Sequence, residues 1–342
     1  MSLITSKRFE EIINKFSDIN PFIVVGDVGI DKYTHGSVNR ISPEAPVPVL
    51  EVQQEWLKLG LAANISHNFQ TLGMSSTICG VIGNEDRANS FESLLEDTGL
   101  KTWGIIRDPS RVTTYKERIT TATQQICRID YERSEMLSKE TEQKVIERLK
   151  DFTGDHSAIV IEDYSKGTLT KDLIKRIIDE GKDKKLLVTV DPGRNAPPEF
   201  YKGANLLKPN LIEARTMVDS LGYTHEKQSV GEMAEVLCDK LKLEKVVITL
   251  GPQGMALFDT LDSSQKEVKI IPTVAPEVFD VSGAGDTTIT LLTASLIAGA
   301  TLEEAAWISN CGAGVVIAKK GTATVNIVEL LTFYRKLRET YQ

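Results

Sequence analysis

The chain has 342 residues, 41% of them hydrophobic and 26% charged, which are ordinary values for a globular protein and argue against a disordered, fibrous or membrane-embedded chain. Its formal net charge of −8 disfavours a protein that binds nucleic acid through a broad basic surface, so an anionic substrate would need a local cluster of cations. The start lacks the apolar core of a signal peptide, and the uncharged stretch 287–302 is short and polar for a membrane span. The four cysteines are scattered, so we expect a cytoplasmic protein with no membrane contact, disulfide framework or zinc site.

Strands and helices are predicted to alternate along most of the chain. Apolar residues at helical spacing predict an amphipathic helix over residues 9–16. Further helices are expected at 170–180, 211–221, 231–241, 284–298 and 302–319. Continuous apolar runs, typical of strands buried on both faces, lie at 21–28, 157–163, 186–191 and 245–250. This alternation is typical of βαβ units, so we predict an α/β fold whose parallel sheet is covered on both sides.

Two segments, residues 31–60 and 111–132, depart from this pattern. The first contains the proline-punctuated ISPEAPVPVLEV, the second is rich in Thr, Ile, Val and Tyr, and in both apolar and polar residues alternate. Alternation predicts strands with one face toward solvent or a partner. We therefore expect a second small sheet that projects from the main one. No linker divides the chain, so we predict a single domain over 1–342 with a β-rich lid.

The strongest local signal for chemistry is VFDVSGAGDTT, residues 278–288. We expect a short strand ending at Asp280, a Gly-Ala-Gly turn and then a long helix. Free N–H groups at a helix start form an anion site, and Gly283 and Gly285 let a phosphate approach closely. Asp286 in the first turn is suited to take a proton from an attacking hydroxyl. It could equally do no more than complement the helix dipole.

Two other turns follow predicted strands. In TLGPQGMALF, Gly251 and Gly254 bracket a tight turn that suits a nucleotide lying along the sheet edge. In KPNLIEA, Asn210 and Glu213 share one face of a helix start and could hold Mg²⁺ through water, or could form a helix cap. The GxGxxG and GxxxxGK[ST] patterns do not occur, which excludes the usual Rossmann and P-loop interpretations.

Candidate residues for a polyhydroxylated substrate lie near the first strand. Asp27 and Asp31 suit hydrogen bonds to sugar hydroxyls, and Asn64 in LGLAAN offers a further polar contact, although turn and cap roles are equally open for each. Basic residues gather in the second alternating segment, and an edge that faces a cleft could bind a substrate phosphate. The candidates for that role are Arg40, Lys116, Arg118 and Arg128.

Together these motifs resemble the ribokinase-like (PfkB) family of carbohydrate kinases over about residues 20–335. DVSGAGDT is similar to the family's C-terminal signature and KPNLIEA to its NxxE element, and DYSKG (163–167) falls between them and the first strand in the family's order. ISPEAPVPVLEV, TTYKERI, QQICRIDYE and GTATV are similar to one subgroup, the D-glycero-D-manno-heptose-7-phosphate kinases, which form the N-terminal half of a bifunctional ADP-heptose synthase. Because no nucleotidyltransferase region follows in this chain, we expect a stand-alone kinase.

The resemblance implies a three-layer α/β/α fold with a mainly parallel central sheet and a small β-sheet lid. It implies transfer of phosphate from ATP, with Mg²⁺, to the C1 hydroxyl of the heptose phosphate, giving the 1,7-bisphosphate for ADP-heptose and lipopolysaccharide core synthesis. The lid would dimerise and would exclude water when closed. Carried over to this sequence, the roles are Asp286 as base, the amides of Ser282, Gly283, Ala284 and Gly285 as anion hole, Asn210, Thr249, Gly251 and Gly254 at ATP, Asn210 and Glu213 at Mg²⁺, and Asp27, Asp31, Asn64, Lys166 and Arg118 at the sugar. Many members also have a monovalent-cation site, typically for K⁺, which would lie near Asp280 and Ser282.

Two departures from the subgroup bear on the exact sugar. Leu61 replaces a glycine of its Gly-Gly-Ala-Ala-Asn element, and Gly193 replaces the lysine of its Asp-Pro-Lys element. The same chemistry on another sugar or sugar phosphate, of ribose or fructose type, is therefore an alternative. A catalytically silent sugar- or nucleotide-sensing protein is a second, although such a protein could dispense with the base Asp286.

Overall fold

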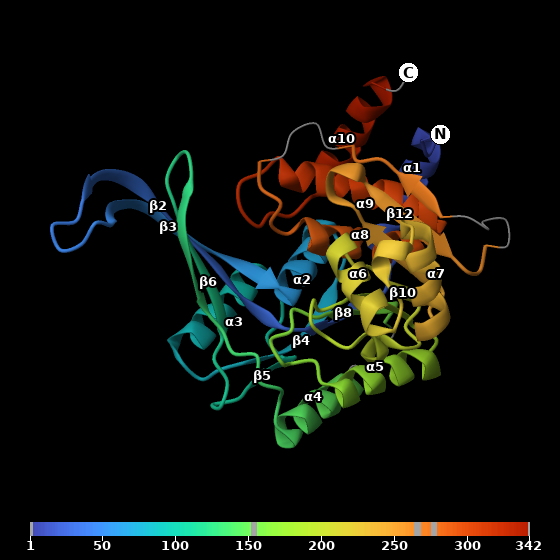
Figure 1. Cartoon of the computed structure of the whole chain (residues 1–342), viewed down its shortest axis with the longest axis horizontal. Helices are drawn as coiled ribbons and strands as arrows, with labels where there is room; N and C mark the ends of the chain where they lie inside the picture. The colour runs from blue at the N-terminus through green and yellow to red at the C-terminus, as the bar shows by residue number, and fades with distance from the viewer. Residues whose placement is uncertain (1–2, 152–155, 263–267, 275–278, 341–342) are drawn as a thin grey trace.

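Two β-sheets of different size organise the chain (Figure 1). The computed structural model describes residues 3–151, 156–262, 268–274 and 279–340. In this part of the chain, no helix is both long and apolar enough to cross a bilayer.

The larger sheet has nine strands and is mainly parallel. Parallel pairing runs from β11 through β1 to β5, while β12 and β13 are antiparallel at one edge. In their order across the sheet, the strands are β13 (Lys269–Ile271), β12 (Met255–Asp259), β11 (Lys245–Thr249), β10 (Leu206–Leu207), β9 (Leu187–Asp191), β8 (Ala158–Glu162), β1 (Phe22–Gly26), β4 (Ser76–Ile82) and β5 (Ile105–Arg107).

Helices cover both faces of this sheet, which explains the continuous apolar runs of its strands. In β1, Phe22 and Val24 pack into the core on one face, and Ile23 and Val25 pack into the core on the other. One face is covered by α1 (Ser6–Asn14), α2 (Ala62–Thr71), α3 (Asp86–Asp97), α8 (Ala284–Ile297), α9 (Leu302–Ile317) and α10 (Ile327–Thr340). The other is covered by α4 (Lys139–Asp151), α5 (Lys171–Asp183), α6 (Leu211–Ser220) and α7 (Val230–Leu241).

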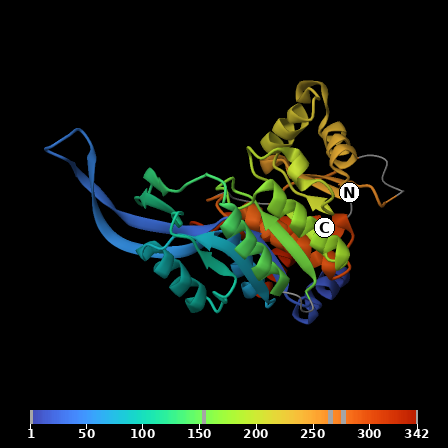
Figure 2. The ribbon, with the colours of Figure 1, turned by 90° about the horizontal axis from the view of Figure 1, so that it is seen from below.

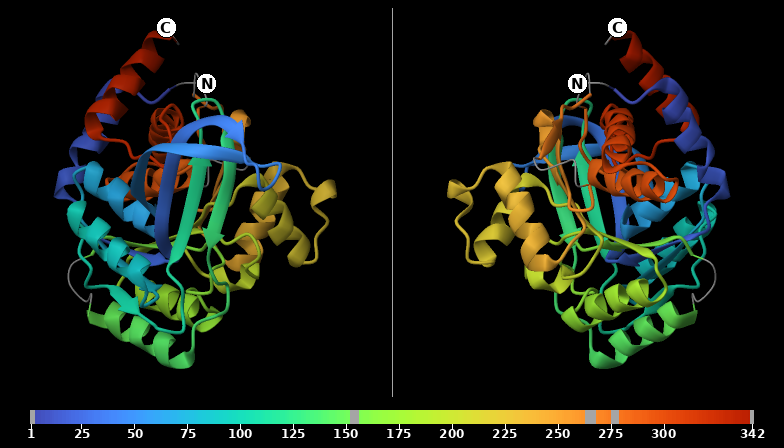
Figure 3. Two further views of the ribbon diagram at one scale, coloured as in Figure 1. Left: turned by 90° about the vertical axis from the view of Figure 1, so that its left-hand side faces the viewer. Right: turned by 90° about the vertical axis from the view of Figure 1, so that its right-hand side faces the viewer.

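The small sheet has four strands in the order β3-β2-β6-β7 and projects from the main body (Figures 2 and 3). Its members are β2 (Val28–Ile41), β3 (Pro48–Leu61), β6 (Thr114–Thr120) and β7 (Gln125–Tyr131). β2 pairs antiparallel with β3 and parallel with β6, and β6 pairs antiparallel with β7. The two alternating segments of the sequence thus supply the strands of one half-exposed sheet.

The predicted α/β fold with a parallel sheet between two helical layers is confirmed, and the predicted elements agree with those of the structure to within a few residues. The short strand expected to end at Asp280 is wrong for the described residues 279–281, and Val278 lies outside them. The backbone N–H groups of Phe279 and Asp280 both donate to the carbonyl of Ile317 at the end of α9. This segment is therefore hydrogen-bonded to the end of a helix and not to a neighbouring strand.

Candidate active site

The start of α8 has the backbone geometry of an anion site. Gly283 is the N-cap residue with a φ of 80°, a left-handed conformation that favours glycine. A Cβ at this position would lie 3.0 Å from Nδ2 of Asn64. No side chain caps the helix, and the N–H groups of a first turn have no helical acceptor. The N–H of Ala284 donates to the carbonyl of Val281, whereas those of Gly283 and Gly285 have no acceptor among the described residues and are available to a ligand.

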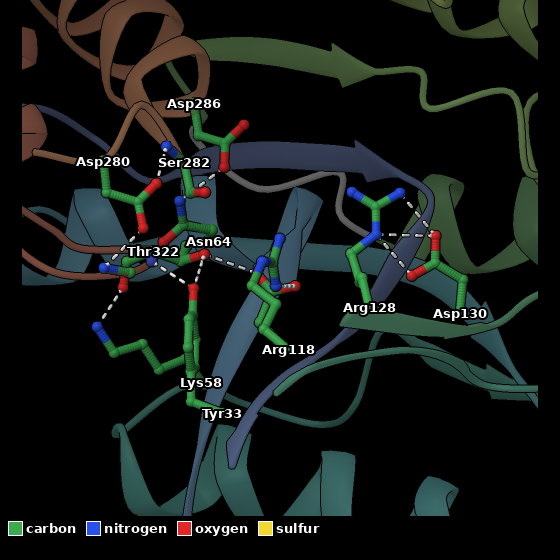
Figure 4. Close-up of polar contacts among 12 residues, drawn as sticks. Tyr33, Lys58, Asn64, Arg118, Arg128, Asp130, Asp280, Ser282, Asp286 and Thr322 are labelled. Atoms are coloured by element: carbon green, nitrogen blue, oxygen red, sulfur yellow. Dashed lines mark hydrogen bonds and ion pairs between the residues drawn. The ribbon is translucent and has the colours of Figure 1, made fainter. Parts of the chain in front are cut away.

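Asp286, in the first turn of α8, is a buried carboxylate held at both oxygens. Its Oδ2 accepts a hydrogen bond of 2.6 Å from Nδ2 of Asn64, and its Oδ1 accepts one of 2.9 Å from the hydroxyl of Tyr164 (the Asn64 contact is drawn in Figure 4). Burial raises the pKa of Asp286 to about 6, while the two hydrogen bonds act in the opposite direction. The group is therefore ionised near neutral pH, yet its pKa is close to the range that suits a general base.

Tyr164 is positioned by Asp27. The Asp27 carboxylate is 1% exposed and accepts backbone hydrogen bonds of 3.0–3.1 Å from Tyr164, Lys166 and Thr168. Three amides on one carboxylate fix the loop that follows β8. In this structure Asp27 therefore holds the loop that carries Tyr164, the residue whose hydroxyl donates to Asp286.

A cavity of about 640 Å³ opens over the carboxyl ends of β8, β9 and β11, next to the start of α8. Asp286, Gly283 and Gly285 line it, together with Asn210, Glu213, Thr249 and Gly251. The structure thus brings together the predicted base, anion site and nucleotide turn in one concave site. Open α/β sheets bind ligands at this edge.

Beyond Glu213 and Asp286, the cavity is lined by five charged residues that were not among the predicted site residues: Glu162, Asp163, Asp191, Arg194 and Lys208. Glu162 and Asp191, the last residues of neighbouring parallel strands, pair in register, and Lys208 lies 2.7 Å from Oδ2 of Asp191. Burial raises the pKa of Glu162, and among the described residues its Oε2 has no hydrogen-bond partner. Lys208 is thus the buried cation of a strongly acidic cavity floor.

Asn210 and Glu213 form the helix cap that the sequence offered as an alternative. Oδ1 of Asn210 accepts from the N–H of Glu213, and Oε2 of Glu213 accepts from the N–H of Asn210, each at 2.9 Å. Oε1 of Glu213 makes no hydrogen bond in the described part of the chain, and the residue lines the cavity. The pair therefore fits Mg²⁺ held through water on one carboxylate oxygen, because Mg²⁺ prefers oxygen ligands and keeps much of its hydration.

A second, more apolar pocket of about 350 Å³ adjoins the cavity beside the turn after β11. Thr249, Gly251 and Gly254 line it, as do Met255 and Ile317. Gly254 has a φ of 95°, and a Cβ there would clash with the carbonyl of Ile271. Its size and walls suit a flat heterocycle, with the attached phosphates directed toward the start of α8.

A buried network joins the small sheet to the loop before α10 (Figure 4). Asp31 accepts a hydrogen bond of 2.6 Å from Thr322 and lies 2.7 Å from Nη1 of Arg118. The hydroxyl of Tyr33 accepts from the N–H of Thr322 at 2.7 Å, and Lys58 donates to the Thr322 carbonyl. Arg118, predicted to bind the sugar, is thus paired with another predicted sugar ligand.

Other predicted cations are also paired. Lys166 lies 2.6 Å from Oε1 of Glu132, and Arg128 lies 2.8 Å from Oδ1 of Asp130. Arg40 is exposed near the end of β2.

Asp280 anchors the glycine turn at the expected monovalent-cation position. Its Oδ1 accepts from the N–H of Ser282 at 2.9 Å and its Oδ2 from the N–H of Gly321 at 3.0 Å. Across the described ranges, no cluster of three potential metal-ligating side chains occurs. The carboxylate of Asp280 is thus engaged by backbone amides, and a K⁺ ion there would depend on further oxygen ligands.

The two departures from the heptose-kinase subgroup have structural counterparts. Leu61 is buried and has a φ of 58°, a conformation costly for a residue with a side chain. At Gly193 a Cβ would lie 2.5 Å from Oγ of Ser165 and 2.8 Å from Cγ of Asp163, so this site accepts only glycine as the loop stands. The cation that pairs with Asp191, two residues before Gly193, is Lys208.

Comparison with known proteins places this geometry in context. The sequence profile described as pfkB family carbohydrate kinase matches residues 29–328. The curated protein "Bifunctional protein HldE" of Citrifermentans bemidjiense is 39% identical over 90% of this chain and 62% of its own length. This chain spans between 62% and 65% of the length of this relative and of two similar HldE proteins. Among solved structures, the fold is similar to phosphofructokinase-2 from Escherichia coli in complex with substrates and products, with a TM-score of 0.75 and 18% identity over 94% of this chain and 100% of the other. It is also similar to Arabidopsis thaliana ribokinase complexed with ribose and ATP, with a TM-score of 0.68 and 18% identity over 92% and 98% of the two chains.

Proposed function

The chain belongs to the pfkB family of carbohydrate kinases, and we propose that it transfers the γ-phosphoryl group of ATP to the C1 hydroxyl of D-glycero-D-manno-heptose 7-phosphate. The observation that carries the phosphoryl-transfer part is Asp286, a buried carboxylate at the N-terminus of α8 beside a glycine turn with open backbone N–H groups. A base and an anion site share one helix start, as transfer to a hydroxyl requires.

In the proposed mechanism, Asp286 takes the proton of the C1 hydroxyl while that oxygen attacks phosphorus and the bond to the ADP oxygen breaks. Each carboxylate oxygen accepts one hydrogen bond in the structure and has a second lone pair for the sugar hydroxyl. The N–H groups of Gly283 and Gly285 would stabilise the charge that develops on the transferred group. The other two amides predicted for this role are engaged within the turn, since the N–H of Ser282 donates to Asp280 and that of Ala284 donates to the carbonyl of Val281. The ion pair of Lys208 and Asp191 lies near the same point, since a Cβ on Gly285 would lie 3.7 Å from Nζ of Lys208 and 3.7 Å from Oδ2 of Asp191.

The nucleotide is proposed to lie in the pocket beside Thr249, Gly251 and Gly254, with its phosphates over the cavity. Glu213 and Asn210 would hold hydrated Mg²⁺ there. That ion would neutralise phosphate charge and orient the leaving group. This arrangement accounts for a cavity floor rich in carboxylates, which would otherwise repel a nucleotide.

The choice of sugar is the more specific part of the proposal. Its support is the 39% identity to a protein named HldE, together with the heptose-kinase motifs of the small sheet. Production of a 1,7-bisphosphate for ADP-heptose and lipopolysaccharide synthesis, in the cytoplasm where ATP is the donor, is part of the same proposal. Because the chain spans less than two thirds of these relatives, the proposal concerns the kinase reaction alone.

We further propose that the small sheet acts as a lid over the sugar and pairs with a second copy of the chain. The support is the apolar surface that its long hairpin exposes, where Ile41, Val47 and Val52 are between 51% and 61% exposed. Exposed apolar residues that gather in a patch mark protein contacts, and Ile41 pairs in register with Pro48, next to Val47. Sedimentation of the purified chain, alone and with Val52→Asp, tests the dimer.

Substrate dependence of ATP consumption tests the proposed function. The panel is D-glycero-D-manno-heptose 7-phosphate, ribose, fructose and fructose 6-phosphate, each with Mg²⁺ and with chelator, and with K⁺ or Na⁺ as counter-ion. We expect the heptose phosphate to stimulate ATP consumption most, and chelation to abolish it. Stimulation by another sugar alone would replace the heptose assignment. No stimulation by any sugar, with sugar binding retained, would favour a sensing protein.

A further inference from the structure

Charge is distributed unequally between the two faces of the small sheet. Lys58, Asp31, Lys116 and Asp130 lie in one register row across the four strands, and Trp56, Tyr33, Arg118 and Arg128 lie in the next row on the same face, since residues two apart share a face of a strand. These two rows hold four cations and two carboxylates. They face the main body, because Lys58 contacts the carbonyl of Thr322 and Lys116 lies over the ring of Tyr164.

On the opposite face, one lysine lies between two carboxylates. Lys32 lies 2.7 Å from Glu55 and 3.2 Å from Glu117. The excess of positive charge therefore belongs to the face turned toward the main body, in a protein whose net charge is −8. A local cationic surface of this kind attracts anions even when the whole molecule is acidic.

Lys116 differs from the other cations of this face because, among the described residues, it has no hydrogen-bond or ion-pair partner. Arg118 pairs with Asp31, Arg128 pairs with Asp130, and Lys58 donates to a backbone carbonyl. Within the described residues, Lys116 makes no hydrogen bond or ion pair. Its Nζ makes a cation–π contact, 5.3 Å from the centre of the Tyr164 ring.

This lysine is also partly desolvated. Burial lowers the pKa of the Lys116 ammonium, and the more distant carboxylates Asp31 and Glu132 offset only part of that effect. An ammonium group that has lost water without gaining an anion is unfavourable in the free protein. A ligand that brings an anionic group to this point would remove the cost, which is what a binding site for an anion offers.

The position of Lys116 relative to the base defines the ligand. The Tyr164 hydroxyl is 2.9 Å from Oδ1 of Asp286, and Lys116 lies over the ring of the same tyrosine. A sugar with its reacting hydroxyl at Asp286 can extend along Tyr164, so that a group at its far end meets Lys116. The separation between the Asp286 carboxylate and Nζ of Lys116 corresponds to the Tyr164 phenol ring and one non-bonded contact on each side of it. A sugar that carries a terminal phosphate can span such a separation.

We propose that Lys116 binds the distal, non-reacting phosphate of the sugar substrate and thereby selects a sugar phosphate over the corresponding neutral sugar. The inference rests on the proposed sugar-kinase function. It replaces Arg118 with Lys116 as the principal phosphate contact, because the guanidinium of Arg118 is already neutralised by Asp31. Lys116 is then a specificity residue that contacts substrate far from the reacting atoms.

The test compares steady-state kinetics of the full chain, Lys116→Gln, Lys116→Arg and the control Lys32→Gln. The control removes the same charge from the same sheet, but from the opposite face. Each protein is assayed with D-glycero-D-manno-heptose 7-phosphate, with the unphosphorylated heptose and with fructose 6-phosphate. For Lys116→Gln we expect KM for the phosphorylated sugar to rise about 10- to 100-fold, the size of a lost charge-assisted hydrogen bond, with kcat and KM for ATP and for the neutral sugar unchanged. Lys116→Arg should retain most of the selectivity, and Lys32→Gln all of it.

The outcomes separate this inference from the heptose assignment. If the wild-type protein uses fructose 6-phosphate instead of the heptose and Lys116→Gln raises the KM for that sugar phosphate selectively, the heptose assignment fails and the role of Lys116 stands. If the variant raises KM equally for neutral and phosphorylated sugars, its role is structural and the inference is wrong. It is equally wrong if the variant changes neither value, or if the wild-type protein prefers the neutral sugar. Thermal unfolding should give Lys116→Gln a Tm equal to or above that of the wild-type protein, because an unpaired, partly buried charge has been removed.

Discussion

Replacement of Asp286 by asparagine should make the protein inactive and, at neutral pH, more stable. The carboxylate is 3% exposed, and its pKa is raised from 3.8 to about 6, chiefly by burial. A raised pKa means that ionisation of this group costs free energy in the folded state but not in the unfolded one. At 1.36 kcal/mol per pKa unit, the penalty at pH 7.5 is ~3 kcal/mol, and Asp286→Asn removes it.

The hydrogen bonds reduce this gain only in part. The side-chain oxygen of asparagine can still accept from Tyr164, whereas its NH₂ group would meet the NH₂ group of Asn64 unless the Asn64 amide turns round. The loss of one hydrogen bond costs ~1 kcal/mol, so the expected net gain is ~2 kcal/mol at pH 7.5. The rate should fall by at least about 10²-fold, the usual size of a general-base contribution.

The sign of the pH dependence makes the reasoning testable. A carboxyl group whose pKa is raised on folding contributes stability below pH ~4 that is lost as the pH rises through ~6. Urea unfolding of the wild-type protein and the variant between pH 4.5 and 8 should therefore show a difference that grows with pH and levels off above pH ~6. Asp97→Asn, a change at an exposed aspartate, is the matched control and should shift stability by less than ~0.5 kcal/mol. A variant less stable than the wild-type protein at pH 7.5, or a difference independent of pH, would refute the argument, and near-normal turnover would refute the base.

Three further substitutions test the surroundings of the base. Tyr164→Phe removes a hydrogen bond that lowers the pKa of Asp286, so the acid limb of the kcat/KM profile should move to higher pH, as pH-dependent kinetics would measure. Gly283→Ala places a side chain at a φ of 80°, which should cost ~1 kcal/mol of stability in thermal unfolding and reduce kcat through crowding of the anion site. Lys208→Gln leaves Asp191 buried without its cation, and urea unfolding should show a loss of about 3–5 kcal/mol.

Each of these has a contradicting result. An acid limb that stays in place would mean that Tyr164 does not act on the base. An alanine variant with unchanged Tm would mean that the turn adapts, and a glutamine variant of wild-type stability would mean that the Lys208 pair is offset elsewhere. Lys240, an exposed lysine beside Asp239, provides a matched control for Lys208 as Lys240→Gln.

The sequence predicted the strands β1, β8, β9 and β11 of the main sheet and the helices α1 and α5 to α9, because these elements have clear local periodicity. It missed the strands β4, β5, β10, β12 and β13 and the helices α2, α3, α4 and α10. For α2 the structure explains why. This helix begins directly after β3, with Leu61 at positive φ as its N-cap and no side-chain cap, and it buries polar residues such as Asn64 and Ser66. The sequence of such a helix has neither a capping residue nor an apolar stripe from which it could be predicted.

In the candidate site, too, residues that belong to one local motif could be predicted, and residues that depend on distant partners could not. Gly283, Gly285 and Asp286 could be identified because one local motif contains the turn, the helix start and the acid. The roles of Tyr164 and Lys208 could not, because each depends on a partner far away in the chain. Glu162 and Asp191 carried a usable signal, since both end predicted parallel strands and must therefore meet at the sheet edge. The partners of charges on the small sheet, such as Arg118, depend on the register between strands that are far apart in the sequence.

The attachment of the small sheet to the main body limits how the sheet can move. β2 follows β1 after the single residue Asp27, and β3 runs into α2 at Leu61, while the N–H of Ala62 donates to the carbonyl of Asp27. The two ends of the long hairpin thus join the main body side by side, through Asp27 and at the Leu61–Ala62 bond. The hairpin is held to the main body again at Thr322, which contacts Asp31, Tyr33 and Lys58. The Asp27 side chain also accepts from the N–H of Tyr164, whose hydroxyl donates to Asp286. We therefore expect any movement of the small sheet at Asp27 to change the position of Tyr164 and its hydrogen bond to the base.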